Sequence, residues 1–358
     1  MYTKQKFNQT MMKKFFTFLG IVFSLSVFAQ TKPEPKSYVA YRTTEKIEID
    51  GKDGEKSWKS AEFTDDFIDI EGKKIPYLKT NVKMLYDDEY FYFFAKMEDP
   101  HIWATLKQRD TVIYHNNDFE IFLDPDNDSH NYYEFEINAL NTVWDLFLTK
   151  PYRERNKVLD GWDINGLKTA VHIEGTLNTP TDVDKFWCVE IAIPWAAMRE
   201  AHMQNNIPTG KFWRVNFSRV HWDFELNEGK YQKKRDEKGK NLPEYNWVWS
   251  PQWKISMHEP ELWGYVYFSE KKVGEKDHFE VPKDESIKRY LYDLYHFSKS
   301  NKRSVLAKKV KEEIIIFKEK ITATFNDNPF FWNISVKSPF SGKTFVIMQD
   351  GKLEEFER

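Results

Sequence analysis

The chain has 358 residues, a formal net charge of −3 and 30% charged residues. This balance provides neither a basic surface for nucleic acid nor a polybasic patch for a membrane, so we expect neither as a partner. The length exceeds one average domain, and the aromatic fraction of 17% suits both β-sheet cores and stacking against sugar rings.

The N-terminus has the pattern of a secretory signal peptide. Lys13 and Lys14 precede a short apolar run, Phe15–Phe28, which is followed by Ala29. The run is too short to span a bilayer comfortably, and no later segment approaches about 20 apolar residues, so no membrane span is expected. We therefore predict a signal peptide over residues 1–29, a linker over residues 30–37, and a protein that is periplasmic or extracellular after cleavage.

Residues 38–272 contain many short apolar runs bounded by Asp, Asn, Gly and Pro, which is typical of strands. The predicted strands are Lys46–Ile49, Asn81–Tyr86, Tyr90–Met97, Asp118–Leu123, Tyr132–Ala139, Val143–Leu148, Lys168–Glu174, Phe186–Ile193, Phe212–Val220 and Gly264–Ser269. A three-residue hairpin connection, Asp87-Asp88-Glu89, favours antiparallel neighbours. We predict a mainly β protein with an antiparallel β-sandwich, one short helix over Pro194–Arg199 and a solvated loop over Lys230–Lys240.

The character of the chain changes after about residue 281. Asp284-Glu285-Ser286 is a plausible helix start, and apolar residues then recur at helical spacing up to about Ile321. Two strand-like runs, Ile334–Val336 and Thr344–Ile347, follow. Residues 273–358 are thus predicted to form a helical appendage with a small C-terminal hairpin, which offers a surface for a protein partner.

One predicted strand joins a core face to a row of acids. Alternation along the strand places Phe119, Ile121 and Leu123 on one face and Asp118, Glu120 and Phe122 on the other. The acids can therefore face a ligand while the apolar side chains stay in the core.

A second predicted strand carries a matching polar row. Glu134, Glu136 and Asn138 share one face, opposite Tyr133 and Phe135. Carboxylates and amides orient sugars through hydrogen bonds to vicinal hydroxyls. A solvated sheet face is the alternative interpretation of the same pattern.

Several ordered pieces of the chain together resemble carbohydrate-binding modules of family 9, and more closely the exported family-9-like proteins, over roughly Val39–Glu270. The pieces are Ile49-Asp50-Gly51 with Trp58 downstream, the Tyr86-Asp87-Asp88 to Tyr90 hairpin, Asn117–Asp126, Phe135–Asn138, Val189–Trp195, Trp213–Phe217 and Trp249–Gly264. The resemblance implies a β-sandwich, in agreement with the strand pattern.

The resemblance also implies where a sugar would bind. Family members clamp the sugar between two Trp rings and fix its hydroxyls with a Glu, an Arg and an Asn. By position these fall at Tyr114, near Met257, and at Glu120, Glu136 and Asn138. The Glu and the Asn are kept, whereas both clamp aromatics and the Arg are altered.

Other tryptophans offer the missing stacking surface. Trp249, Trp253 and Trp263 are candidates, with core packing as the alternative for Trp249 and the expectation for Trp263. The predicted carbohydrate-binding residues are Tyr114, Glu120, Glu134, Glu136, Asn138, Trp249 and Trp253.

The loop after the first acidic strand is a candidate calcium site. Asp124, Asp126 and Asp128 occupy every second position and offer hard oxygen ligands, the type that calcium prefers. The loop lacks the glycine and the distal glutamate of an EF-hand, and a plain acidic turn is the alternative. Calcium in relatives supports the prediction through the resemblance, and no other cofactor is expected.

The function indicated by these patterns is noncatalytic: an exported protein that holds oligo- or polysaccharide during carbohydrate catabolism. A glycoside hydrolase or its accessory subunit is the first alternative, because Glu120, Glu134 and Glu136 offer carboxylate pairs, although no catalytic residue is assigned. An envelope interaction module with a degenerate sugar site is the second. A haem module that uses Met84, Met97 or Met257 with a nearby histidine is the third.

Overall fold

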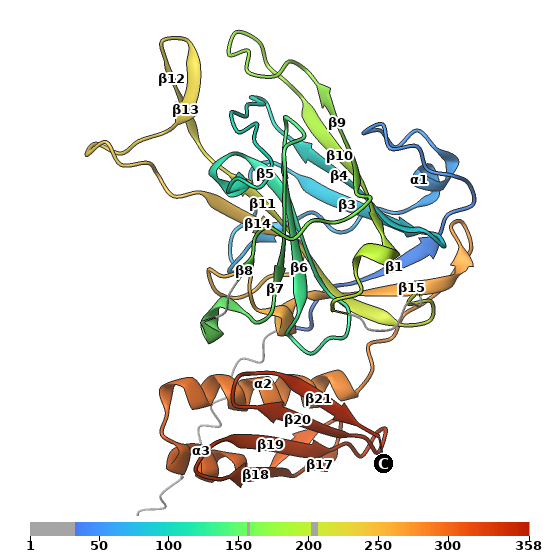
Figure 1. The fold of residues 1–358 in the computed structure, drawn as a ribbon, viewed down its shortest axis with the longest axis vertical. Coiled ribbons are helices and arrows are strands. Elements are labelled where there is room, and N and C mark those ends of the chain that lie inside the picture. Colours follow the sequence, from blue (N-terminus) through green and yellow to red (C-terminus); the bar gives the residue numbers. More distant parts are fainter. Residues whose placement is uncertain (1–32, 156–157, 202–206, 358) are drawn as a thin grey trace, which may run out of the picture. The chain divides into compact units, whose positions relative to one another are not determined.

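The structure is a computed structural model that describes residues 33–155, 158–201 and 207–357 (Figure 1). The predicted signal peptide, residues 1–29, lies outside the described residues. Within them, no helix combines the length and the apolar character needed to cross a bilayer.

The predicted mainly β sandwich is confirmed. Thirteen strands join one sheet system: β1 (Ser37–Arg42), β2 (Ile68–Asp69), β3 (Thr80–Tyr86), β4 (Tyr90–Glu98), β5 (Asp118–Asp124), β6 (Tyr132–Asn138), β7 (Val143–Leu148), β8 (Val158–Leu159), β9 (Lys168–Glu174), β10 (Phe186–Pro194), β11 (Phe212–His221), β14 (Tyr245–Val248) and β15 (Gly264–Lys272). Short helices lie between them: α1 (Lys56–Ser60), η1 (Ile113–His115), η2 (Tyr152–Glu154), η3 (Trp195–Ala197) and η4 (Pro260–Leu262).

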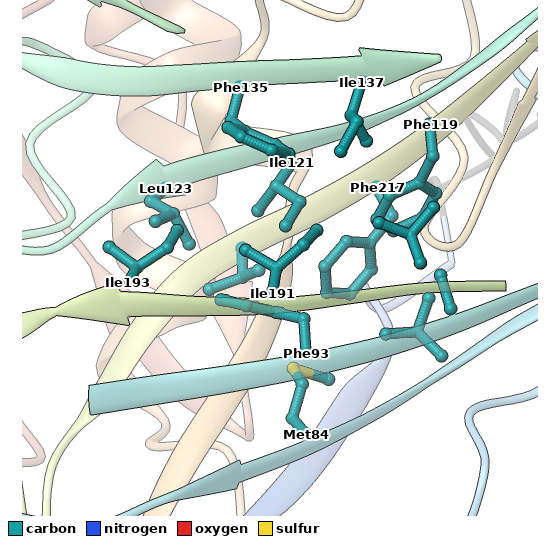
Figure 2. Packing of buried hydrophobic residues seen from close by; sticks show 14 of the residues in the cluster. Met84, Phe93, Phe119, Ile121, Leu123, Phe135, Ile137, Ile191, Ile193 and Phe217 are labelled. Carbon is teal, nitrogen blue, oxygen red and sulfur yellow. The ribbon is translucent and has the colours of Figure 1, made fainter. Parts of the chain in front are cut away.

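The strands follow the order β8-β7-β6-β5-β11-β15-β1-β3-β4-β10-β9, and β14 pairs with β11 and β2. Strand β1 pairs in parallel with β15 and β3, while the other described pairings are antiparallel, as in β5 with β6. Inward side chains of β5, β6 and β11 meet those of β4 and β10 in one core, where Phe119, Ile121 and Phe135 lie opposite Phe93 and Ile191 (Figure 2). The predicted alternation along β5 is therefore correct.

A buried carboxylate ties the N-terminal segment to β10. Glu190 Oε1 accepts a hydrogen bond from Trp58 Nε1 at 2.8 Å, and its Oε2 accepts from the backbone N–H groups of Asp50 and Gly51 at 2.8 and 2.9 Å. Gly51 has a φ of +84°, and a Cβ there would meet the backbone of His172. Two of the sequence pieces quoted above thus meet at one structural anchor.

Three local predictions in the sandwich are corrected. Lys46–Ile49 is not a strand, because its backbone pairs with side chains instead; Glu48 N, for example, donates to Glu55 Oε1 at 3.1 Å. The predicted Lys230–Lys240 loop begins with β13 (Lys230–Lys233), which pairs with β12 (Phe224–Asn227). The predicted helix over Pro194–Arg199 is only the short 3₁₀ turn η3.

The C-terminal appendage has a core of its own. Helix α2 (Asp284–Ser300) and helix α3 (Arg303–Val310) pack on a four-stranded antiparallel sheet: β18 (Ala323–Asp327), β19 (Trp332–Lys337), β20 (Thr344–Met348) and β21 (Leu353–Phe356). The predicted helix to Ile321 is wrong beyond Val310, since β16 (Ile314–Ile316) and β17 (Glu319–Ile321) form a hairpin. The predicted small hairpin is the centre of the larger sheet.

The appendage contacts the sandwich through buried polar groups. Arg214 Nη2 of β11 donates to Glu285 Oε2 of α2 at 2.6 Å, and both side chains are buried. The hydroxyls of Tyr292 and Ser129 pair at 2.6 Å. The domain boundary near residue 272 and the protein partner of the appendage stay predictions.

Candidate functional site

Four carboxylates lie on one face of two neighbouring strands. Glu120 of β5 stands directly opposite Glu136 of β6, and Glu134 follows two residues away on the same face. Asp118 lies two residues from Glu120 on β5, so its side chain shares that face. Like charges in directly opposite positions destabilise an antiparallel pair, so this arrangement requires an explanation beyond the fold.

These acids are buried, contrary to a solvated sheet face. Asp118 and Glu136 are at most 1% exposed, and Glu120 and Glu134 are 5% exposed. Burial raises the pKa of Glu120 to about 7, and the nearby Glu244 adds to this rise. Burial raises the pKa of Asp118, Glu134 and Glu136 well above the ordinary value, and Glu120 raises each further.

The carboxylates have few partners. Val220 N donates to Asp118 Oδ1 at 3.2 Å, and Tyr114 N donates to Glu136 Oε2 at 2.9 Å. Asp118 Oδ2 and Glu134 Oε2 are buried without a hydrogen-bond partner among the described residues. The ion pairs of the described chain include none from a lysine or an arginine to these acids; His258 Nε2 lies 3.9 Å from Glu134 Oε1.

Two accessible tyrosines flank the acids. Tyr114 in η1 is 38% exposed and Tyr152 in η2 is 47% exposed. Burial raises the pKa of Tyr152, and the charges of Glu134 and Glu136 raise it further, as does the neighbouring Tyr114. The rings and the carboxylates therefore lie within electrostatic reach of one another. A sugar could stack on such rings while its hydroxyls donate to the acids.

Tyr152 packs against the residue that follows Met257, and Met257 is the position at which the resemblance places the second clamp residue. Met257 itself is buried in an apolar cluster with Trp263, as expected for Trp263. The next residue, His258, packs edge-on against Tyr152, with ring centroids 4.1 Å apart and an interplanar angle of 76°. Tyr132 OH pairs with His258 Nδ1 at 2.8 Å, and burial lowers the pKa of His258 to about 3, which leaves its ring neutral.

The structure separates other predicted residues from this group. Trp249 is 2% exposed and packs in the sandwich core against Phe217 and the backbone of Gly264, so its prediction as a stacking surface is corrected. Trp253 is half-buried with a φ of +60°, and its ring lies against Gly72 in the turn after β2. It shares no described ring contact with the Tyr114–Tyr152 pair.

Asn138 lies beside the acids but is used by the chain itself. Its Oδ1 accepts hydrogen bonds from Leu140 N and Thr142 N at 3.0 and 3.1 Å, and its Nδ2 donates to Leu106 O at 2.9 Å. The side chain is fully buried. Its amide therefore holds the turn after β6, and a direct role toward a sugar stays a prediction.

The predicted calcium loop brings its three acids together. Oxygen atoms of Asp124, Asp126 and Asp128 lie within 4.8 Å of one another. Asp124 accepts from Asn127 N and Ser129 N at 3.1 and 3.0 Å. Although Asp126 is exposed, desolvation by the surrounding chain raises its pKa, and the charge of Asp128 raises it further. Hard oxygens at this spacing fit calcium, which stays a prediction.

Two other acidic groups already hold cationic partners. Arg109 pairs with Asp145 and Asp163, and Arg153 pairs with Glu259 and Glu261. A hollow of about 570 Å³ adjoins Arg109 and Asp163, and another of about 260 Å³ lies elsewhere; neither is lined by the four acids. We place the site at the acids, because buried carboxyl oxygens without a hydrogen-bond partner require a ligand more than an open hollow does.

The methionines that the haem alternative requires as ligands lie in apolar clusters. Met84 and Met97 are fully buried in the sandwich core and Met257 lies in an apolar cluster. His101 Nδ1 pairs with Tyr231 OH at 3.1 Å. These methionine sulfurs are packed among apolar side chains, so the structure does not favour a haem site there.

Sequence comparison places the chain in a family. Residues 49–268, more than half of the chain, match the family model described as carbohydrate family 9 binding domain-like. The chain belongs to this family of carbohydrate-binding domains. No match was found among curated proteins.

The solved structures to which the chain is similar are distant in sequence. A candidate carbohydrate-binding protein from Bacteroides uniformis is 17% identical, with 66% of this chain and 100% of that chain covered and a TM-score of 0.49. A family 9 module from Caldicellulosiruptor kristjanssonii in complex with cellotriose is 17% identical, with 68% and 98% covered and a TM-score of 0.40. A family 9 module from Caldicellulosiruptor kristjanssonii in complex with glucose is 17% identical, with 69% of this chain and 100% of that chain covered and a TM-score of 0.40.

Proposed function

We propose that the chain is an exported, noncatalytic protein that binds oligo- or polysaccharide and holds it during carbohydrate breakdown. The observation that carries the proposal is a set of four buried acids beside two accessible tyrosines, Tyr114 and Tyr152, inside a domain of a carbohydrate-binding family; two of the acids, Asp118 and Glu134, have an oxygen without a hydrogen-bond partner in the described chain. Hydroxyl groups of a sugar would supply the hydrogen-bond donors that these oxygens lack.

The site favours binding over hydrolysis. A glycosidase needs one protonated and one ionised carboxyl group at the bond that breaks. Here burial moves the pKa of Glu120, Glu134 and Glu136 in the same direction, upward. The ion pairs of the described chain include no lysine or arginine that would keep one of the three ionised. Hydrolysis therefore stays the alternative that the binding experiment must also test.

Isothermal titration of the mature protein against neutral β-linked glucans, xylans and mannans tests the proposal. Wild type should bind at least one class saturably, and Tyr152→Ala should weaken it about tenfold, since the loss of about 1.4 kcal/mol from a stacking contact has that effect. Phe330→Ala, which removes an exposed ring of the appendage, is the control and should bind as wild type does. Flat heats across the panel would favour the envelope module.

The same samples test the other parts of the proposal. Release of shorter sugars during the titration would indicate a hydrolase. Fractionation of a bacterial host that expresses the full chain should place the protein outside the cytoplasm, and deletion of residues 1–29 should retain it inside.

The calcium loop is a separate part of the proposal. Calcium bound at Asp124, Asp126 and Asp128 would raise the melting temperature by mass action. The rise should be smaller in an Asp126→Asn/Asp128→Asn variant. An identical rise in both proteins would exclude the loop as the source of the stabilisation.

A further inference from the structure

Three of the buried acids converge closely enough to share one ion. Oxygen atoms of Asp118, Glu120 and Glu136 all lie within 4.8 Å of one another. Calcium binds oxygen at about 2.3–2.6 Å, so two oxygens on one ion can lie up to about 5 Å apart. The spacing of the trio therefore fits a single calcium-sized ion.

Buried carboxyl oxygens without a hydrogen-bond partner are a second observation, separate from the spacing, that indicates a ligand. Asp118 is fully buried, and its Oδ2 has no hydrogen-bond partner in the described chain, although its Oδ1 accepts from Val220 N. Glu134 is 95% buried on the same sheet face, and its Oε2 is also unpartnered. A buried acceptor without a donor is costly, and most such groups in proteins have a partner.

No lysine or arginine of the described residues forms an ion pair with the trio. Lys233, which exerts a positive charge on Asp118, has its Nζ over the Trp222 ring, 3.2 Å from the ring centroid, and forms no ion pair with the acids. His258 is the ring that faces Glu134, and it is buried beside Arg153. Glu244 adds a further negative charge near Glu120. A bound cation would supply the missing charge.

We propose that Asp118, Glu120 and Glu136 bind one hard divalent cation, and that the sugar hydroxyls complete its coordination between Tyr114 and Tyr152. An all-oxygen ligand set selects hard ions such as calcium, and vicinal hydroxyls are oxygen ligands of the same kind. The sugar half of this inference rests on the proposed function, whereas the metal half does not. Sugar binding at this site would then require calcium.

The experiment must separate the trio from the loop at Asp124, Asp126 and Asp128. All proteins therefore carry Asp126→Asn and Asp128→Asn, are treated with chelator, and are titrated with calcium chloride. The background protein should bind one calcium ion per chain. Adding Glu136→Gln or Asp118→Asn should weaken this binding at least tenfold, whereas adding Asp163→Asn, an acid-to-amide change at another acidic cluster, should leave it unchanged.

Each outcome decides between the two claims. Circular dichroism first establishes that every variant is folded. No calcium binding by the background protein, or equal binding after Glu136→Gln, overturns the metal site. Equal sugar affinity with calcium and with chelator leaves the proposed function standing and overturns the coupling. Calcium binding at the trio without sugar binding leaves the metal site standing and rejects the proposed function.

A positively charged ligand is the remaining alternative. Glucosamine oligomers, which carry ammonium groups, are therefore titrated in chelator. Binding of these oligomers that is lost in Glu136→Gln, in a protein that binds no calcium, would assign the charge to the sugar itself and overturn the proposal.

Discussion

Two groups of buried carboxylates in this molecule differ in their charge partners. At the contact with the appendage, Glu285 and Glu261 face Arg214 and Arg153. On the outer face of β5 and β6, the acids around Glu120 have no such partner within the described chain. Burial is similar in both places, so burial alone does not mark a functional group. The two groups differ in whether a cationic side chain contacts them.

Removal of Arg214, a cationic partner of Glu285, should have the largest effect on stability. Arg214 donates to Glu285 and to the backbone carbonyls of Glu261 and Trp263. Arg214→Met would leave the two buried carbonyls without this donor and Glu285 with Lys288 as its remaining cationic partner, so we expect a loss of about 3 kcal/mol in the free energy of unfolding by urea. Arg214→Met/Glu285→Leu should lose less, and a wild-type value for the single variant would contradict the comparison.

Glu190 tests the same principle with neutral partners. Its carboxylate accepts hydrogen bonds from Trp58 Nε1 and from two backbone N–H groups. Glu190→Ala leaves the buried donors of Trp58 and Gly51 unpaired and should destabilise the protein by about 3 kcal/mol in urea unfolding. Glu190→Gln keeps an acceptor oxygen and should cost less; equal losses in both variants would show that side-chain volume, not hydrogen bonding, matters.

The acids with cationic partners, Glu261 and Glu285, should also make the stability of the protein depend on pH. Burial alone would raise the pKa of Glu261, but Arg153 and His296 lower it below the ordinary value; Lys288 and Arg214 do the same for Glu285. A lowered pKa in the folded protein stabilises it above the unfolded pKa of 4.5, and this stability is lost as the pH falls further.

Proteolysis measures whether the segment that joins the sandwich to the appendage becomes accessible when these ion pairs are lost. Cleavage by an acid-tolerant protease within residues 273–283, which join β15 to α2, should increase several-fold between about pH 6 and about pH 3 relative to an unstructured peptide of that sequence. A constant ratio would show that these ion pairs do not hold the appendage.

The acids on β5 and β6 have no lysine or arginine partner in the described chain, so removal of one of them should stabilise the protein. We expect this effect to be the smallest of the series. Glu136→Gln removes one of two carboxyl groups that face each other across β5 and β6. In chelator at about pH 8 the variant should be more stable than wild type by about 1 kcal/mol. Glu62→Gln, at an exposed acid, should change nothing. Destabilisation by Glu136→Gln would mean that a protein group already balances the charge.

The sandwich could be predicted because alternation and turn residues are local properties. Strands β7 and β9 begin and end where the sequence pattern predicts, and β5 differs by one residue. The end of α3 could not be predicted in this way. The run from Ile314 to Ile321 keeps a helix-like recurrence of apolar residues, but tertiary pairing makes it a hairpin.

The site was only partly predictable. Glu120, Glu134 and Glu136 follow from alternation, since register on one sheet face places them together. Tyr152 lies in an irregular segment after β7, where no periodicity indicates which way a side chain points. Trp249 was ambiguous because an aromatic ring suits a core and a ligand equally, and only the close approach of Gly264 shows that it is enclosed.

The pairing of Arg214 with Glu285 has a consequence for the evolution of the chain. A gene truncated or recombined after β15 would encode a sandwich whose buried guanidinium had lost its carboxylate. Such a fragment would fold poorly unless a second substitution removed the arginine. The two parts are therefore expected to be inherited together, and this sandwich would not behave as a freely exchangeable module in a multidomain enzyme.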